Sequence, residues 1–190
     1  MNFKCPVCLS TSLTRTWQKD GPQSFTCPDC GGVLVAMDSY LSWRDSNRSR
    51  SINSKEAPRR LPSQSVISAE KTGLKFCPGC RHAMRKYRIS ETIACHLDRC
   101  GNCFYFWMDG NEWILLQELG LLGDIPEVFS ADWQKTIRLK ESENALEKHW
   151  IERLGKADHA RIKELVEWLQ THEMRDDLIA YQLSTLGLTE

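Results

Sequence analysis

The sequence predicts a small mixed α+β protein, with short antiparallel β-hairpins in its first part and a helical C-terminal region. Three observations indicate this class. Eight of the nine cysteines form four Cys-x-x-Cys pairs, a spacing typical of small, turn-rich modules. The segment that carries the first two pairs and the segment that carries the last two share one layout, which is an internal repeat. From residue 109 onward, apolar residues recur at helical spacing.

Length and composition exclude several classes of protein. The 190 residues have room for one medium domain or several small ones. Lys and Arg together number 25, as do Asp and Glu, which argues against a uniformly basic nucleic-acid binder and against an acidic disordered chain. The longest apolar runs, 33–37 and 104–108, are far shorter than the ~20 residues of a membrane span, and residues 1–6 show no apolar signal core. We therefore expect a soluble, cytoplasmic protein that does not contact membranes.

Charge is distributed unevenly along the chain. Residues 1–103 hold 16 basic and 8 acidic side chains, whereas residues 104–190 hold 9 basic and 17 acidic ones. Such asymmetry predicts two surfaces with different partners, or halves that attract each other. Solvated helix faces are the alternative explanation for the acidic residues.

The composition divides the chain into four segments. Residues 1–43 form a first cysteine module, and residues 75–122 form a second one with a helix at its C-terminal end. Between them, residues 44–74 are rich in Ser, Arg and Pro and are predicted to be a flexible basic linker. Residues 123–190 form a helical region, and a segment of this size is marginal as an independent core.

The cysteine spacing points to metal binding. The odd number of cysteines argues against a closed disulfide framework. Four thiolates complete a tetrahedral zinc site at Zn–S distances of about 2.3 Å, and modules this small need the metal for much of their folding energy. The local pairs predict two structural Zn²⁺ ions, one held by Cys5, Cys8, Cys27 and Cys30 and the other by Cys77, Cys80, Cys100 and Cys103. Bound iron, an iron–sulfur cluster and redox-active pairs are the alternatives, and four pairs in two short repeats favour zinc.

The second repeat resembles the zinc ribbon of the transcription factor IIB type. Its Cys-Pro-Gly-Cys at 77–80 and Cys-Gly-Asn-Cys at 100–103 are followed by Trp107, Asp109 and Glu112, which match the Trp-x-Asp-x-x-Glu of that family. Phe104 and Tyr105 stand where the family usually has glycines, so we expect this turn to expose aromatic surface. The first repeat keeps Cys-Pro-Asp-Cys-Gly-Gly at 27–32 but lacks the tail. The resemblance covers a little under half of the chain and implies two four-cysteine zinc ribbons, without implying a particular task.

Helix signals follow the second repeat. Asp109 and Glu112 have the spacing of a capping box. Capping residues and glycines predict four helices in this region: Asp109 to Gly120, Ser130 to Gly155, one opened by Asp158, and one from Thr171 or Asp176 to before Gly187.

Cys95 lies outside the four pairs. Alternation along residues 93–97 places it on the same strand face as Ile93 and Leu97, so it is predicted to be a small buried apolar residue. Ligand exchange that involves Cys95 or His96 is the alternative. His82, close to Cys80, is interpreted as a surface group or as a neighbour of the ligands.

The predicted sites favour binding over catalysis. A closed four-thiolate site has no open coordination position with which to activate water, so we expect a protein without enzymatic activity. Seven tryptophans, the acidic helical region and the aromatic pair Phe104 and Tyr105 predict an adaptor or regulatory subunit that binds a protein partner. The basic segment 44–103, which includes Arg85, Lys86 and Arg88, supports nucleic-acid binding or a transcription-associated role as the alternative. The oligomeric state stays open.

Overall fold

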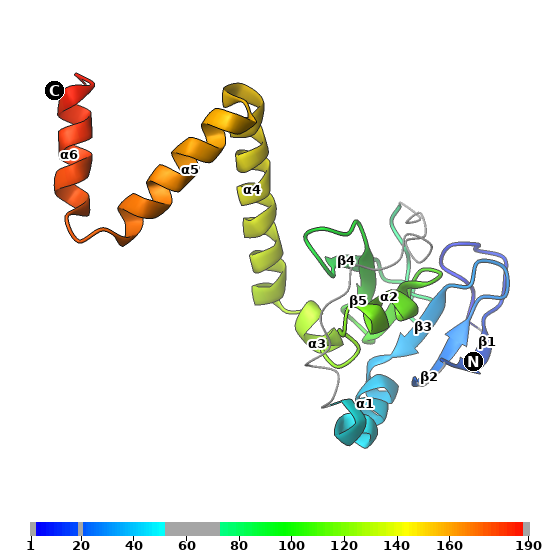
Figure 1. Cartoon of the computed structure of the whole chain (residues 1–190). Coiled ribbons are helices and arrows are strands. Elements are labelled where there is room, and N and C mark those ends of the chain that lie inside the picture. Colours follow the sequence, from blue (N-terminus) through cyan, green and yellow to red (C-terminus); the bar gives the residue numbers. More distant parts are fainter. Residues whose placement is uncertain (1–2, 19–20, 52–72, 188–190) are drawn as a thin grey trace. The chain divides into compact units, whose positions relative to one another are not determined.

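The computed structural model describes residues 3–18, 21–51 and 73–187, and the side chains of 48–51 are not described (Figure 1). The chain divides into two compact units, Met1–Arg138 and Leu139–Glu190. The first unit contains the β-strands and both cysteine repeats, and the second consists of helices. The predicted mixed α+β class is confirmed.

All six strands of the first unit belong to one antiparallel sheet. They are β1 (Thr14–Trp17), β2 (Gln23–Thr26), β3 (Val33–Ala36), β4 (Met84–Arg88), β5 (His96–Cys100) and β6 (Tyr105–Met108). Their order across the sheet is β1-β2-β3-β6-β5-β4, so each repeat supplies three neighbouring strands. The sequence left open whether the two repeats pack together, and the pairing of β3 with β6 joins them.

The strands of the central pair have two buried faces. Val33 and Val35 of β3 and Phe106 of β6 point into one apolar cluster, whereas Leu34 and Trp107 belong to a second cluster. This division follows from the alternation of side chains along a strand. Because both faces are covered, the central strands are continuous apolar runs.

Three helices of the first unit pack against the first of these clusters: α1 (Met37–Ser51), α2 (Glu112–Glu118) and α3 (Ile125–Val128). Tyr40 of α1 is fully buried, and its hydroxyl donates a hydrogen bond to the carbonyl oxygen of Leu122 at 2.6 Å. Trp43 of α1 meets Trp113 of α2 edge to face, with ring centroids 5.5 Å apart. Helix α1 therefore closes the apolar face that both repeats share.

Helix α1 overlaps the segment predicted to be a linker. The prediction placed the start of the linker at residue 44, whereas the helix continues to Ser51. The remainder of the predicted linker, from 52 to 72, lies outside the described residues. Local composition missed this helix because its residues are mostly polar, and the packing of Tyr40 and Trp43 on the sheet outweighs that weak signal.

The long helices agree with the sequence signals. Helix α4 spans Ala131–Leu154, α5 Lys156–Thr171 and α6 Arg175–Thr185. Ser130 caps α4 as predicted, since its Oγ accepts a hydrogen bond from the N–H of Trp133 at 3.1 Å. Gly155 separates α4 from α5 with a φ of 79°. Helix α5 begins two residues before Asp158, which was expected to cap it, and the short helix α3 was not predicted.

None of the described helices combines the length and the apolar character that crossing a membrane requires.

Candidate metal centres

The structure brings the eight paired cysteines together in two groups. In each group the four Sγ atoms lie within 4.8 Å of one another, and the members are Cys5, Cys8, Cys27 and Cys30 in one and Cys77, Cys80, Cys100 and Cys103 in the other. One pair of each group precedes the first strand of its repeat, and the other pair lies at the turn that joins the second and third strands, with Cys100 as the last residue of β5. These are the two predicted sets, and each set is built from one repeat.

Each Cys-x-x-Cys pair and the residue after it form a tight turn, which we call a cysteine turn. Backbone hydrogen bonds close three of these turns, such as the bond from Leu9 N–H to the carbonyl of Cys5 at 2.9 Å. The residue after the second cysteine adopts the left-handed conformation in all four: Leu9 (φ 62°), Gly31 (φ 70°), Arg81 (φ 65°) and Phe104 (φ 60°). Only one of the four is glycine, so three cysteine turns hold a side chain in a conformation that L-residues rarely adopt.

The sulfur separations test whether a metal ion fits. In the first group Cys5 and Cys30 are 3.7 Å apart and Cys8 and Cys27 are 3.9 Å apart. Four separations in the second group run from 3.3 to 3.6 Å. A tetrahedron with bonds of 2.3 Å has edges of about 3.8 Å, so both groups have the size of a four-thiolate metal site. All nine cysteines are free thiols.

The protonation of the cysteine thiols also indicates that each group needs a bound cation. Burial raises the pKa of the Cys5 and Cys77 thiols well above the ordinary value. In contrast, the backbone N–H of His82 lowers the pKa of Cys80 to about 6. Four neighbouring thiolates repel one another, so full ionisation of either group requires a bound cation, and metal binding therefore releases protons.

One apolar cluster lies between the two groups. It contains cysteines of both repeats together with Phe3, Leu13, Leu34, Met84 and Trp107. Leu34 and Trp107 are fully buried at its centre. Loosening of one cysteine group therefore disturbs packing that the other group uses.

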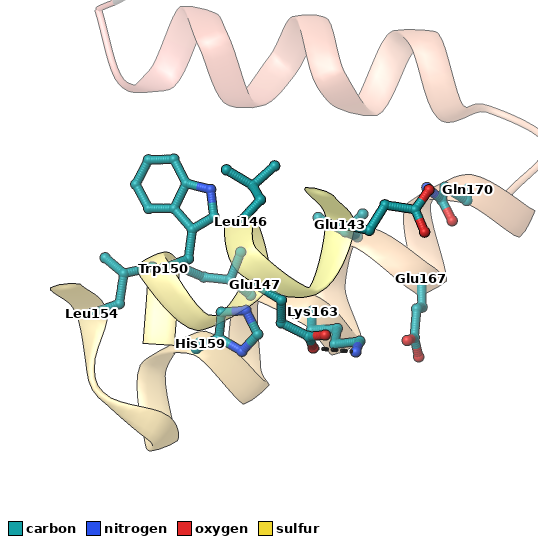
Figure 2. A pocket seen from close by; sticks show the side chains of 11 residues that line it. Glu143, Leu146, Glu147, Trp150, Leu154, His159, Lys163, Glu167 and Gln170 are labelled. Atoms are coloured by element: carbon teal, nitrogen blue, oxygen red, sulfur yellow. Dashed lines mark hydrogen bonds and ion pairs between the residues drawn. The ribbon is translucent and has the colours of Figure 1, made fainter. Parts of the chain in front are cut away.

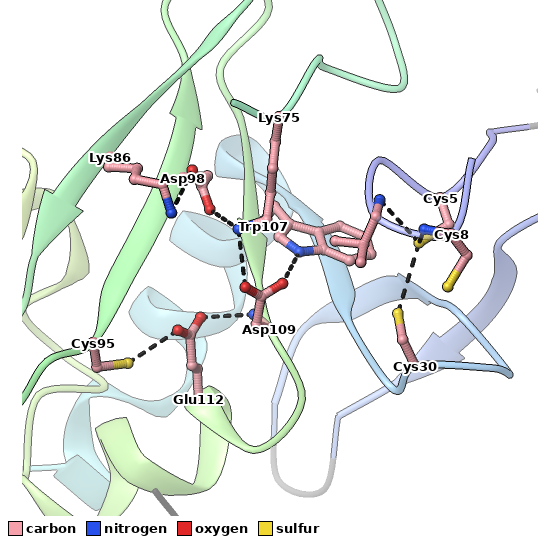
Figure 3. Close-up of polar contacts among 11 residues, drawn as sticks. Cys5, Cys8, Cys30, Lys75, Lys86, Cys95, Asp98, Trp107, Asp109 and Glu112 are labelled. Atoms are coloured by element: carbon pink, nitrogen blue, oxygen red, sulfur yellow. Dashed lines mark hydrogen bonds and ion pairs between the residues drawn. The ribbon is translucent and has the colours of Figure 1, made fainter. Parts of the chain in front are cut away.

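Figure 3 shows a buried ion cluster that was not predicted from the sequence. The ammonium group of Lys75, 4% exposed, donates to Asp98 at 2.6 Å and to Asp109 at 2.9 Å. Asp109 also accepts from the indole N–H of Trp107 at 2.6 Å. Burial disfavours the Lys75 ammonium, but the two carboxylates outweigh it and raise the pKa of Lys75. This cluster fixes the chain before Cys77 to strand β5 and to the residue that follows β6.

The predicted capping box forms only in part. Helix α2 begins at Glu112, and the Glu112 carboxylate accepts from the backbone N–H of Asp109 at 2.7 Å. Asp109 does not cap the helix, because its carboxylate is engaged by Lys75 and Trp107. The second oxygen of Glu112 accepts from the thiol of Cys95 at 3.0 Å. Cys95 is buried, as the sequence predicted, and lies outside both cysteine groups.

The residues predicted to bind partners occupy different environments. Arg85 and Lys86 are exposed on the edge strand β4. Arg88 is half-buried, and its carbonyl accepts from the side-chain amide of Gln134 at 2.8 Å. Phe104 is 52% exposed, with the guanidinium carbon of Arg99 5.5 Å from its ring centroid.

Tyr105, the remaining residue of that set, is half-buried. Its ring meets Phe3 of the first repeat edge to face at 5.5 Å and also lies 3.4 Å from the position of a Cβ on Gly79. The structure therefore places Tyr105 in packing between the repeats.

Comparison of the chain with protein-family models, with curated proteins and with solved structures finds no match. The chemical interpretation therefore rests on the site itself. One ion bound by all four sulfurs of a group would cross-link two hairpins and leave no open coordination position. A weak signal for the ion cluster does exist in the sequence, since Lys75 and Asp98 each stand two residues before a cysteine pair.

Proposed function

We propose that this protein is a non-enzymatic adaptor, stiffened by two structural Zn²⁺ ions, that binds a protein partner. Zinc is the ion we assign because four thiolates in a closed tetrahedral arrangement match its preferences. The two sites are proposed to be zinc ribbons of the transcription factor IIB type joined through one sheet. The observation that carries the binding role lies in the helical unit.

The helical unit leaves its apolar residues unburied. Of residues 139–187, all of which are described, Leu169 alone is buried. Helices α4 and α5 enclose an open cavity of about 630 Å³, which we call the helical groove (Figure 2). Its apolar side chains are spaced four residues apart on each helix: Leu146, Trp150, Leu154, Ile162 and Val166. An exposed apolar groove of this kind is typical of a surface that receives an amphipathic helix.

The rim of the helical groove is acidic. Glu143, Glu147 and Glu167 line it together with Lys163 and His159. Lys163 donates to Glu147 at 2.7 Å (Figure 2), and the rim carries a formal net charge of −2 with histidine counted as neutral. Charge complementarity therefore favours a partner helix with one apolar face and basic flanks.

A synthetic model helix tests this function. A fluorescent peptide with leucines on one face and lysines on the other is titrated into the zinc-loaded, full-length protein, beside a peptide of the same pattern with glutamates in place of lysines. We expect the lysine peptide to bind more tightly and Trp150→Ala to weaken its binding by about tenfold or more, as loss of a central aromatic residue does.

Trp168 provides the matched control. It is exposed on α5 to a similar extent, 49% against 41% for Trp150, and does not line the helical groove. Trp168→Ala is expected to leave binding unchanged. Equal binding of both peptides, or equal effects of the two tryptophan variants, would contradict the proposal.

Nucleic-acid binding is the second candidate function. It is supported by the exposed cations Arg85 and Lys86 on edge strand β4. Binding of this kind weakens steeply with salt, because phosphate contacts release counterions. Titration of single-stranded and duplex DNA at low and moderate salt tests it, and Arg85→Ala is expected to reduce the salt slope.

A further inference from the structure

A second candidate binding surface lies in the first unit. The first cysteine turn and the chain that leads into the third enclose a cleft of about 360 Å³, which we call the inter-turn cleft. Its lining residues from the first repeat include Lys4, Val7 and Leu9. Those from the second repeat include Leu74, Phe76 and Arg81.

Large apolar side chains stand open to solvent around the inter-turn cleft. Leu9 is 71% exposed, Leu74 is 65% exposed and Phe76 is 48% exposed. They come from both repeats, and the shared sheet holds the two repeats together. Convergence of exposed apolar side chains on one concave site is typical of a binding surface.

Two lining residues are held in a strained conformation. Leu9 and Arg81 both follow the second cysteine of a cysteine turn and both have φ values in the left-handed region. Glycine adopts this conformation without strain, and Gly31 does so in the equivalent turn. The chain therefore keeps an apolar side chain and a cation at the cleft in positions where glycine would favour folding.

The charge of the inter-turn cleft is positive. Lys4 and Arg81 line it, and no carboxylate lines it among the described residues. The exposed ammonium group of Lys4 also donates to the carbonyl oxygen of Ser10 at 2.8 Å and to Ser12 Oγ at 3.2 Å. Lys75, which also lines the cleft, directs its ammonium group to Asp98 and Asp109. The sulfur of Cys5 is turned inward, where the N–H groups of Val7 and Cys8 donate to it.

We propose that the inter-turn cleft binds a peptide segment of a partner protein that carries large apolar side chains flanked by Asp or Glu. The apolar side chains contact Leu9, Leu74 and Phe76, and the carboxylates pair with Lys4 and Arg81. Two rim cations match one or two carboxylates, whereas specific nucleic-acid sites neutralise many phosphates. Together with the helical groove, this site gives the protein two binding surfaces. The proposal for the cleft does not depend on the proposal for the groove.

Peptide selection tests the proposal. The zinc-loaded, full-length protein is used to select binders from a random dodecapeptide display library, and the selected peptides are resynthesised for titration. We expect sequences in which Asp or Glu flank Leu, Ile, Phe or Trp. Leu9→Gly and Arg81→Gly are each expected to weaken their binding by about tenfold or more.

The two glycine variants separate binding from folding. Glycine relieves the left-handed strain at either position, so melting temperature and zinc content are expected to stay unchanged or rise. Trp17→Ala is the matched control, because Trp17 is 67% exposed in the same unit and does not line the cleft. The selected peptides are also expected to bind Trp150→Ala normally, whereas the lysine peptide of the helical groove is expected to bind Leu9→Gly normally.

Several outcomes would overturn the proposal. One is the absence of any selected peptide whose binding depends on Leu9 or Arg81. Another is selection of basic peptides. A random single-stranded DNA that loses binding in Arg81→Gly would assign the cleft to nucleic acid, and a dimer that dissociates in Leu9→Gly would assign it to a second copy of the chain.

Discussion

Leu34 lies directly opposite Trp107 in the central strand pair, and each stands four residues after the last cysteine of its repeat. The antiparallel register is therefore symmetric about this pair. A large ring on one side and a smaller side chain on the other fill the space between the two cysteine groups. Leu34 and Trp107 therefore occupy equivalent positions in the two repeats, but their side chains differ in volume.

The indole of Trp107 lies over Gly32, and a Cβ added to Gly32 would stand 2.1 Å from Cζ2 of Trp107. We expect Gly32→Ala to destabilise the protein by about 1–3 kcal/mol, because the fully buried indole of Trp107 has no space into which it can move. Chemical denaturation measures the change. Gly101→Ala is the control, since a Cβ at Gly101 meets no atom within 4 Å. Trp107→Leu is expected to relieve the clash in the double variant, and strictly additive losses would contradict this explanation.

Lys75→Met removes the cation of the buried ion cluster. Asp109 is then left buried without an ammonium partner, and Asp98 keeps only Lys86, whose Nζ lies 4.0 Å from Asp98 Oδ1, so we expect a loss of about 3–5 kcal/mol in the free energy of unfolding. Addition of Asp98→Asn to this variant is expected to restore part of the loss, because it removes one of the two buried carboxylate charges. A loss below about 1 kcal/mol for Lys75→Met, the range of exposed pairs, would show that water enters the cluster.

Glu112 predicts a specific dependence of stability on pH. Burial raises its pKa from 4.5 to about 8 in the folded protein. Between these values the folded protein holds a proton that the unfolded chain has lost, so the free energy of unfolding falls as the pH rises through this window. The slope approaches about 1.4 kcal/mol per pH unit inside it.

Glu112→Gln isolates this contribution. The amide cannot titrate, so we expect the stability difference between wild type and variant to change over the window and to be flat above it. Denaturation at several pH values measures the difference, and subtraction removes effects that both proteins share, such as metal release. Parallel pH profiles of the two proteins would rule out the proposed titration.

Cysteine substitutions test the metal assignment. Cys100→Ser removes one ligand of the second group, and we expect it to lower the zinc content below two ions per chain. Because both groups border the cluster around Trp107, the remaining ion is also expected to be lost to a chelator more easily. Cys95→Ser, outside both groups, is expected to retain two ions. Elemental analysis and native mass spectrometry give these ratios, and equal zinc loss in both variants would refute the ligand sets.

Local features of this protein could be predicted from its sequence. The cysteine sets follow from the spacing within each repeat. Helices α4 to α6 follow from apolar periodicity, with Ser130 marking the start and Gly155 the end of α4. Pairing of β3 with β6 could not be predicted in this way, because it joins segments about 70 residues apart and no local pattern specifies the partner.

The buried ion cluster could also not be predicted from local sequence patterns. Asp109 has the spacing of a helix cap, but the tertiary fold brings Lys75 to it, and a buried ammonium competes successfully with the helix N–H groups. Leu9 and Arg81 are separated by 72 positions, and only the assembled sheet shows that they border one cleft.

The symmetric register of β3 and β6 has a consequence for either half of the first unit on its own. A single repeat would expose the apolar edge Val33–Ala36, or its counterpart in the second repeat, and unsatisfied strand edges recruit other strands. Because the edge is self-complementary about Leu34, two copies of one ancestral repeat could pair through it as a homodimer. Gene duplication and fusion would then convert that homodimer into a single polypeptide with the symmetric strand pair seen here.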